Sequence, residues 1–229
     1  NRTFRVGTGE LADSLALDEI IPYSQKLIPF FNQQKNAVLE LKTKSNCVKN
    51  LLTQKSPNNV IVSWSLNPQI IIDQEEKGTP SLEQRLEAAL LCANKGYKIG
   101  LHLDPIIISP NWESAYHGMI EKIFEVLLPS QIEWISLGSF RYRGALKKII
   151  NERHKNTRLF TSEHIVSKDG KHRYLRSLRN EAYQNLRGFL KKISTDLNVY
   201  ICMETKEVWE GVTGKMPRAD EKLDKFFDL

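Results

Sequence analysis

Short runs of β-branched and other apolar residues alternate along this chain with longer stretches in which apolar positions recur at helical spacing. This pattern predicts strands over residues 3–6, 37–41, 60–66, 97–103, 132–137 and 199–203. It predicts helices over residues 20–31, 47–54, 81–95, 112–128, 145–154, 183–193 and 222–227. Strands that alternate with helices in this way are typical of parallel β/α units joined by right-handed crossovers.

Two local signals sharpen this prediction. Ser81 and Gln84 have the spacing of a capping box, which predicts that a helix begins there. The dipeptide Asp-Gly at 169–170 is typical of a tight turn, and it predicts a hairpin between residues 165–167 and 172–175.

Polar side chains follow five of the predicted strands at the points where those strands end. They are Glu10 and Asp13, Lys42 and Lys44, Ser65 and Asn67, His102 and Asp104, and Ser139 and Arg141. The carboxyl ends of parallel strands meet at one mouth, where α/β proteins build their sites. This pattern favours an incomplete parallel β/α barrel of the TIM type over a doubly wound open sheet. We assign residues 1–140 to the barrel core and 141–229 to a basic part that completes the barrel and covers its mouth.

The composition is that of an ordinary globular protein, with 41% hydrophobic and 26% charged residues. No apolar run reaches the roughly 18 residues that a membrane-spanning helix needs, so we expect a cytoplasmic protein without a membrane partner. The net charge of +6 is uneven, because residues 1–130 carry 13 Lys and Arg against 14 Asp and Glu, whereas 131–229 carry 20 against 13. A basic half on a neutral scaffold indicates an anionic partner, and a solvated surface is the simpler alternative.

The basic residues are concentrated over 141–192, where 15 Lys and Arg stand against 4 Asp and Glu. Arginine for phosphates, interleaved with aromatic residues for exposed bases, is what a nucleic-acid surface needs. The candidate contacts are Arg141, Tyr142, Arg143, Arg173, Tyr174, Arg176 and Arg179. The predicted hairpin would then enter a groove beside an extruded base. The alternative is an excursion that only packs over the barrel mouth.

Several standard sites are absent from the sequence, which has no Walker loop, no GxGxxG, no GxSxG and no HExxH. The three cysteines, Cys47, Cys92 and Cys202, have neither a CxxC nor a zinc spacing. We therefore expect no metal site built from the residues of this chain.

Four of the strand-end residues suit a zwitterion such as an amino acid. Its amine needs an acceptor such as Glu10, and its carboxylate needs donors such as Lys44, Ser65 and Asn67. A plain ion pair between Glu10 and Lys44 is the alternative. An aldolase-like β/α enzyme that uses Lys44 as a Schiff-base amine is a further possibility.

A set of longer motifs runs through the chain. It comprises GTGELADSLALD at 7–18, ELKTKS at 40–45, SWSLNP at 63–68, EKGTPSLEQRLEAA at 76–89, GYKIGLHLDPII at 96–107, FRYRG at 140–144, DGKHRYLRSLRNEAY at 169–183 and VYICMETKEVWEGVTG at 199–214. With these motifs, in this order, the chain resembles the spore photoproduct lyase family, a branch of the radical S-adenosylmethionine enzymes. The resemblance implies an incomplete β/α barrel, in agreement with the hydrophobic pattern.

The resemblance further implies a lyase that repairs a thymine dimer in DNA. In this family a CxxxCxxC loop holds a [4Fe–4S] cluster, S-adenosylmethionine chelates the remaining iron, and its cleavage yields a 5′-deoxyadenosyl radical. An electron donor such as flavodoxin or ferredoxin is implied as a partner. The sequence has no CxxxCxxC, and in the family that loop precedes the first strand found here. We therefore expect a fragment that lacks the first β/α unit and is inactive by itself.

The family's cofactor contacts fall on strand-end residues of this chain. The positions implied are Glu10 for the methionine amine, Asp13, Lys44 and Ser65 for the methionine end, and His102 and Asp104 along the adenosine. Asn67 joins them through the zwitterion argument.

The family's hydrogen-donating cysteine has no counterpart here, because residues 7–10 read GTGE. Cys202, on the last predicted strand, is the candidate substitute, and core packing is its alternative role. For the whole chain, the alternative function is a non-redox nucleic-acid-binding β/α protein that has lost the cluster. Such a protein would bind nucleic acid with a steep salt dependence and gain nothing from S-adenosylmethionine.

Overall fold

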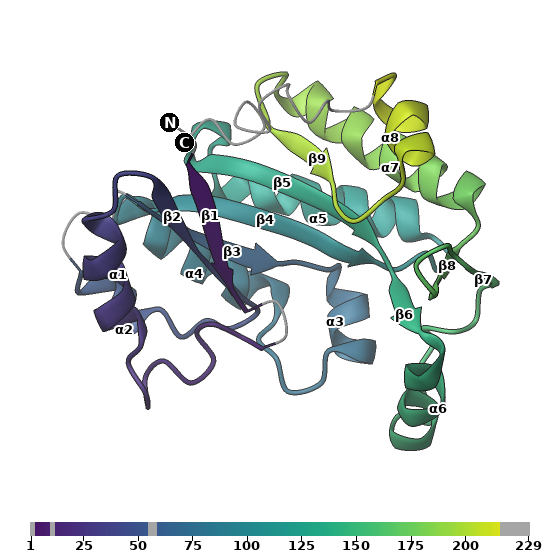
Figure 1. Cartoon of the computed structure of the whole chain (residues 1–229), viewed down its shortest axis with the longest axis horizontal. Helices are drawn as coiled ribbons and strands as arrows, with labels where there is room; N and C mark the ends of the chain where they lie inside the picture. The colour runs from purple at the N-terminus through teal and green to yellow at the C-terminus, as the bar shows by residue number, and fades with distance from the viewer. Residues whose placement is uncertain (1–2, 10–11, 55–58, 216–229) are drawn as a thin grey trace.

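The computed structural model describes residues 3–9, 12–54 and 59–215 (Figure 1). The helix predicted over 222–227 and the candidate residue Glu10 lie outside these described residues. Within the described ranges, no helix combines the length and the apolar character needed to span a bilayer.

Six parallel strands form the main sheet, and their order in space follows their order in the chain. They are β1 (Phe4–Thr8), β2 (Ala37–Thr43), β3 (Val60–Ser65), β4 (Lys98–Ile106), β5 (Ile132–Ser139) and β9 (Val199–Ile201). The sheet curls into a half barrel with β1 and β9 at its edges (Figure 1). A doubly wound sheet would reverse its strand order at a switch point, so this order confirms the predicted incomplete β/α barrel.

Helices follow the strands and cover the outer face of the sheet (Figure 1). They are α1 (Ser24–Asn32), α2 (Lys49–Leu52), α3 (Gln69–Glu75), α4 (Leu82–Asn94), α5 (Trp112–Val126), α7 (Arg176–Ile193) and α8 (Lys206–Thr213). Strand residues such as Leu101 and Leu137 form one buried core with Leu86, Ile120 and Leu186 of the helices. Each such side chain stabilises the fold by about 1.5–3 kcal/mol through its burial.

The inner face of the sheet carries a group of polar residues next to a small apolar cluster of Val38, Ile61 and Trp134, whereas the outer face is apolar. Successive side chains of a strand point to opposite faces, and in β2 this places Leu39 and Leu41 in the outer core but Glu40 and Lys42 on the inner side. The inward polar residues are Arg5, Glu40, Lys42, Ser63, His102, Asp104 and Ser136. The strands of a parallel sheet are usually apolar on both faces. The polar groups on this inner face therefore indicate a functional site.

A second, antiparallel sheet continues directly from β5. It contains β6 (Arg141–Arg143), β7 (His164–Val166) and β8 (Lys171–Tyr174), in the order β6-β8-β7. The predicted hairpin is thus confirmed, and Gly170 takes the positive φ of 75° that its turn requires. Helix α6 (Gly144–Arg153) follows β6, has no buried residue and projects away from the body (Figure 1).

Some elements differ from their predictions. The first helix begins at Ser24 rather than at residue 20, and α7 begins at Arg176 rather than at 183. Helices α3 and α8 and strand β6 were not predicted: α3 has three consecutive isoleucines and therefore no helical period, and β6 has only three residues. The capping box of α4 is confirmed, since Ser81 and Gln84 exchange both hydrogen bonds.

Candidate functional site

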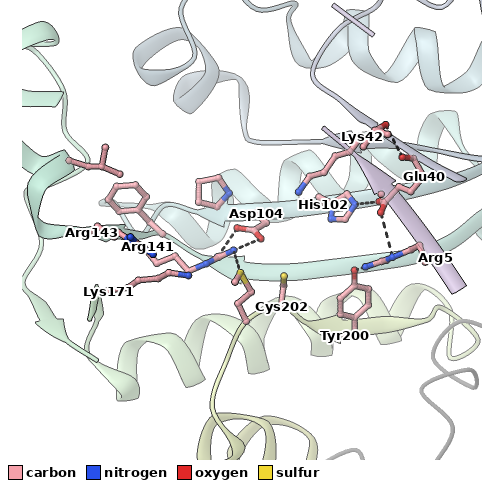
Figure 2. Close-up of a pocket in the computed structure, with 16 residues that line it drawn as sticks. Arg5, Glu40, Lys42, His102, Asp104, Arg141, Arg143, Lys171, Tyr200 and Cys202 are labelled. Carbon is pink, nitrogen blue, oxygen red and sulfur yellow. Dashed lines mark hydrogen bonds and ion pairs between the residues drawn. The ribbon is translucent and has the colours of Figure 1, made fainter. Parts of the chain in front are cut away.

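A cavity of about 740 Å³ lies on the concave face of the half barrel (Figure 2). Side chains of β1, β2, β4 and β9 form one part of its wall, and those of β6, β8 and α6 form the other. The cavity, here called the central cavity, therefore lies between the barrel strands and the second sheet.

The floor of the central cavity is a network of buried polar side chains around Glu40. The His102 Nε2 atom lies 2.7 Å from Glu40 Oε1, and the Ser63 hydroxyl donates to the same oxygen at 2.6 Å. On its other side, His102 Nδ1 lies 2.6 Å from the Ser136 hydroxyl. Arg5 Nε approaches Glu40 Oε2 at 3.5 Å. The network joins strands β1 to β5 through side chains alone.

The charge states in this network follow from its contacts. Burial alone would raise the pKa of the Glu40 carboxyl, but the hydrogen bond and charge of His102, together with Arg5, lower that pKa to about 2. Burial lowers the pKa of His102. At neutral pH the pair is therefore a carboxylate and a neutral imidazole, in which Nε2–H donates to Glu40 and Nδ1 accepts from Ser136.

Asp104 and Arg141 form an ion pair in the wall of the central cavity. Arg141 donates from Nη1 and Nη2 to the two carboxylate oxygens of Asp104, at 2.9 and 3.0 Å. Burial opposes the charged form of Arg141, yet the bond to Asp104 raises the pKa of the guanidinium overall. Gly138 on the neighbouring strand leaves room for the carboxylate, because a Cβ there would lie 2.6 Å from Asp104 Cγ.

Cys202 lines the central cavity beside this ion pair (Figure 2). Burial, and then the negative charge of Asp104, raises the pKa of its thiol to about 11. Cys202 is therefore a protonated thiol at neutral pH, and it faces the cavity rather than the hydrophobic core. Its neighbour Met203 lies with its sulfur 3.2 Å from Arg141 Nη2.

Cations outnumber carboxylates in the central cavity. Its charged lining residues are Arg5, Lys42, Arg141, Arg143 and Lys171 against Glu40 and Asp104. In the part of the chain that the structure describes, no carboxylate lies within ion-pairing distance of Lys42 or Arg143. The cavity is thus suited to an anionic ligand.

A second cavity, of about 270 Å³, lies at the ends of β1, β2 and β3. Asp13, Lys44 and Ser65 line it, so the structure brings together these three predicted cofactor residues. The Asp13 carboxylate accepts hydrogen bonds from Thr43 and from the backbone of Lys44. Lys44 Nζ forms an ion pair with Glu76 Oε1 at 2.7 Å. An ammonium and a hydroxyl at one cavity fit the carboxylate end of an amino acid.

The other predicted cofactor residues lie differently. Asn67 is buried, donates to Glu76 and accepts from the Tyr116 hydroxyl, and it lines neither cavity. His102 and Asp104 line the central cavity, and their polar atoms are engaged by neighbouring side chains. Contacts of these residues with a cofactor stay a prediction.

The seven predicted nucleic-acid residues divide into two groups. Arg173 pairs with Asp169, and Arg179 with Glu204, and both arginines are buried. The buried aromatic residues of the group, Tyr142 and Tyr174, belong to a packed cluster under the second sheet. Arg141 and Arg143 line the central cavity, and Arg176 is exposed at the start of α7.

The described residues do not fit an iron–sulfur cluster. Among them, no group of three or more His, Cys, Asp or Glu side chains is arranged to hold a metal ion. Cys92 is buried in the outer core and Cys47 lies apart from Cys202.

Sequence reasoning missed the residues that build the floor. Arg5, Glu40 and Tyr200 line the central cavity but were not predicted as site residues. A signal was present, because residues 39–42 read Leu-Glu-Leu-Lys in a strand that lies between two neighbours and would otherwise be apolar on both faces.

Comparisons with known proteins agree with this architecture. The sequence model of the family described as spore photoproduct lyase matches residues 3–200. The chain is 28% identical over 155 residues to the spore photoproduct lyase of Bacillus subtilis (strain 168), which covers 66% of this chain and 45% of that protein. It is 26% identical over 149 residues to the Clostridium acetobutylicum enzyme, covering 65% and 44%. The chain spans about half the length of the curated relatives it matches.

Solved structures show the same fold. A spore photoproduct lyase mutant superposes with a TM-score of 0.79 at 23% identity, over 87% of this chain and 61% of that one. A second mutant, with bound AdoMet and dinucleoside spore photoproduct, superposes with a TM-score of 0.76 at 22% identity, over 89% and 62%.

Proposed function

Because this chain belongs to the spore photoproduct lyase family, we propose that it is part of a radical S-adenosylmethionine lyase that acts on damaged nucleic acid. The family match over residues 3–200 carries the proposal. The half barrel adds a chemical reason, because its concave face holds a cation-rich cavity beside a smaller one suited to an amino acid.

We propose that the smaller cavity takes the methionine end of S-adenosylmethionine. Lys44 and Ser65 would donate to its carboxylate, Glu10 would accept from its amine, and Asp13 would hold the loop around it. Asn67 would act through Glu76, which pairs with Lys44. The adenosine would then lie along the wall that carries His102 and Asp104. Bound beside an iron–sulfur cluster, S-adenosylmethionine supplies hydrogen-atom abstraction. We propose that the cluster ligands, and the site of the electron donor, lie outside these 229 residues.

The substrate would occupy the central cavity. Arg141 and Arg143 would bind a phosphodiester, with Arg176 at the rim, while the buried Arg173 and Arg179 would hold the second sheet in place. A phosphate is matched by the fork of an arginine and by several cations at once. Of the predicted nucleic-acid residues, only those on the cavity side of the second sheet would then contact the substrate.

We propose Cys202 as the hydrogen-atom donor. A protonated thiol in the cavity can give one hydrogen atom, an electron together with a proton, to a carbon radical of the substrate. Its high pKa suits this role, because a thiolate has no hydrogen atom to give.

The test is anaerobic iron and sulfide reconstitution of the full-length gene product, with the 229-residue chain as control. We expect an electron paramagnetic resonance signal in the long form only, which shifts when S-adenosylmethionine is added. We also expect the reconstituted full-length product to cleave dinucleoside spore photoproduct, the compound bound in a related solved structure. A full-length product without a cluster would contradict the proposal.

The two alternatives are less well supported. A binding protein without redox chemistry is not favoured, since the matched relatives are lyases. An aldolase-like role needs Lys44 as a free amine, but its Nζ forms an ion pair with Glu76.

A further inference from the structure

Asp104 is a carboxylate among the cations of the central cavity. The other carboxylate of the lining, Glu40, is occupied by His102, Ser63 and Arg5 on the floor. Asp104 instead faces the second sheet, from which the cations Arg141, Arg143 and Lys171 reach the cavity (Figure 2). It is therefore the negative group nearest to the proposed phosphate site.

The Asp104 carboxylate binds the Arg141 guanidinium in the way that a phosphate group would bind it. Two parallel N–H groups of the guanidinium meet the two oxygens of Asp104, at 2.9 and 3.0 Å. The same fork is what an arginine offers to two oxygens of a phosphate. While Asp104 occupies it, Arg141 cannot make that contact with a ligand.

Arg141 has other contacts that would keep it in place if Asp104 moved away. Its Nη1 donates to the carbonyl oxygen of Ser139 at 3.1 Å, and its Nη2 lies 3.2 Å from Met203 Sδ. Lys42 is a second cation near Asp104. Its side chain points into the same cavity, and no carboxylate of the described part pairs with Lys42 (Figure 2). An exchange of partners therefore leaves neither charge isolated.

We propose that Asp104 is a specificity-determining residue that competes with the substrate phosphate for Arg141. An anionic substrate binds only if its interaction with Arg141, Arg143 and Lys171 outweighs the loss of the Asp104 pair. An anion that contacts Arg141 alone would therefore bind weakly, whereas a phosphodiester that also contacts Arg143 and Lys171 can still bind. The inference rests on the proposed function, in which the central cavity takes a nucleic-acid substrate.

The opposite role for Asp104 is the familiar one, in which a carboxylate orients an arginine for its ligand. The two roles differ in sign. A competitor that is removed makes the phosphate bind more tightly, whereas the loss of an orienting group makes it bind less tightly.

The experiment is calorimetric titration of thymidylyl-thymidine, which carries a single phosphodiester, into the full-length protein and its Asp104→Asn variant. We expect the variant to bind roughly tenfold more tightly, because one charge-assisted interaction no longer has to be broken. Asp104→Ser removes the same carboxylate, and it serves if the asparagine variant does not fold. Glu152→Gln is the matched control, since it removes an exposed carboxylate from α6 outside the cavity, and its affinity should equal that of the wild type.

The outcomes separate the two proposals. Tighter binding by the Asp104 variants alone supports the competitor role. Equal or weaker binding by these variants, with clear binding by the wild type, overturns that role and leaves the proposed function standing. No binding by any form overturns the nucleic-acid substrate, and the competitor role with it.

Discussion

At the scale of single residues, the central cavity differs from an ordinary charged surface because its groups change each other's chemistry. Asp104 is the clearest case, since it forms an ion pair with Arg141 and at the same time raises the pKa of the Cys202 thiol. The reactivity of Cys202 therefore reports on Asp104 without any substrate being present.

We expect Cys202 to be alkylated by iodoacetamide at pH 8 roughly 100-fold more slowly than a cysteine in a short peptide. The reason is its pKa of about 11, which leaves little thiolate at that pH. Asp104→Asn should speed the reaction, because a negative neighbour is removed while Arg141 stays. The measurement is peptide-resolved mass spectrometry, which separates Cys202 from Cys47 and Cys92.

Glu152→Gln should leave this rate unchanged, as its carboxylate lies outside the cavity. A Cys202 that reacts like a peptide thiol in the wild-type protein would contradict the raised pKa.

At the scale of elements, the strands were the part most readily predicted. Alternating runs such as 37–41 and 60–66 are bounded by turn residues, and each became a strand of the barrel. The first strand and β9 are short, and their predicted bounds differ from the observed ones by one or two residues. The outward apolar face of each strand needs only local sequence to be recognised.

The site was less predictable than the fold, because its geometry depends on contacts between distant strands. Asp13, Lys44 and Ser65 were found from their positions at strand ends, which sequence shows directly. The pairing of Glu40 with His102 joins residues 62 positions apart, and no local pattern indicates it. Asn67 has the same local signal as Ser65, and only packing reveals that it is engaged by Tyr116.

The packing of strand β4 requires a glycine at position 100, and the reason is visible only in the folded barrel. Gly100 lies on the inner face, where a Cβ would come within 2.6 Å of Ser63 Oγ and 2.8 Å of Trp134 Nε1. We expect Gly100→Ala to lower the free energy of unfolding by about 2–3 kcal/mol, since the neighbours are buried and cannot easily move. Urea denaturation followed by circular dichroism measures this change.

Gly118 provides the matched control for that substitution. It lies within α5, and a Cβ added there meets nothing within 4 Å. Gly118→Ala should raise the free energy of unfolding by about 0.5–1 kcal/mol, because alanine favours a helix. Equal effects of the two substitutions would show that the inner face of β4 is not tightly packed.

At the scale of the whole molecule, the network around Glu40 holds the curled sheet together from within. It contacts strands β1 to β5, and Arg5 extends it to Tyr200 on the opposite edge strand at 3.3 Å. The half barrel has no closing strand between β1 and β9 in the described sheet. Side chains that cross the interior therefore help to set its curvature.

We expect the protein to lose stability in acid through this network. The pKa of His102 is lower in the folded state than its ordinary value of 6.5, so the unfolded chain gains a proton first as the pH falls below 6.5. The pKa of Glu40 is lowered from 4.5 to about 2, so the same holds for Glu40 below pH 4.5. The stabilisation is thus complete above pH 6.5 and is lost as the pH falls towards 2.

Glu40→Gln tests this account by denaturant unfolding between pH 3 and pH 8. At pH 7 it should lower the free energy of unfolding by about 3 kcal/mol, because it breaks a buried charged contact. It should also flatten the decline in acid. Glu87→Gln on the exposed side of α4 should behave as the wild type. An unchanged acid decline in the Glu40 variant would assign that decline to other groups.

The attachment of the second sheet has a mechanical consequence. A single residue, Phe140, separates β5 from β6, and a single residue, Leu175, separates β8 from α7. Residues 141–174 are thus connected to the rest of the chain by two single-residue links. Hydrogen bonds of Thr157 and Arg158 to Glu75, and of Tyr174 to Ile108, hold them against the barrel. Because Arg141, Arg143 and Lys171 all belong to this part of the chain, any displacement of the second sheet would move three positive charges of the cavity together.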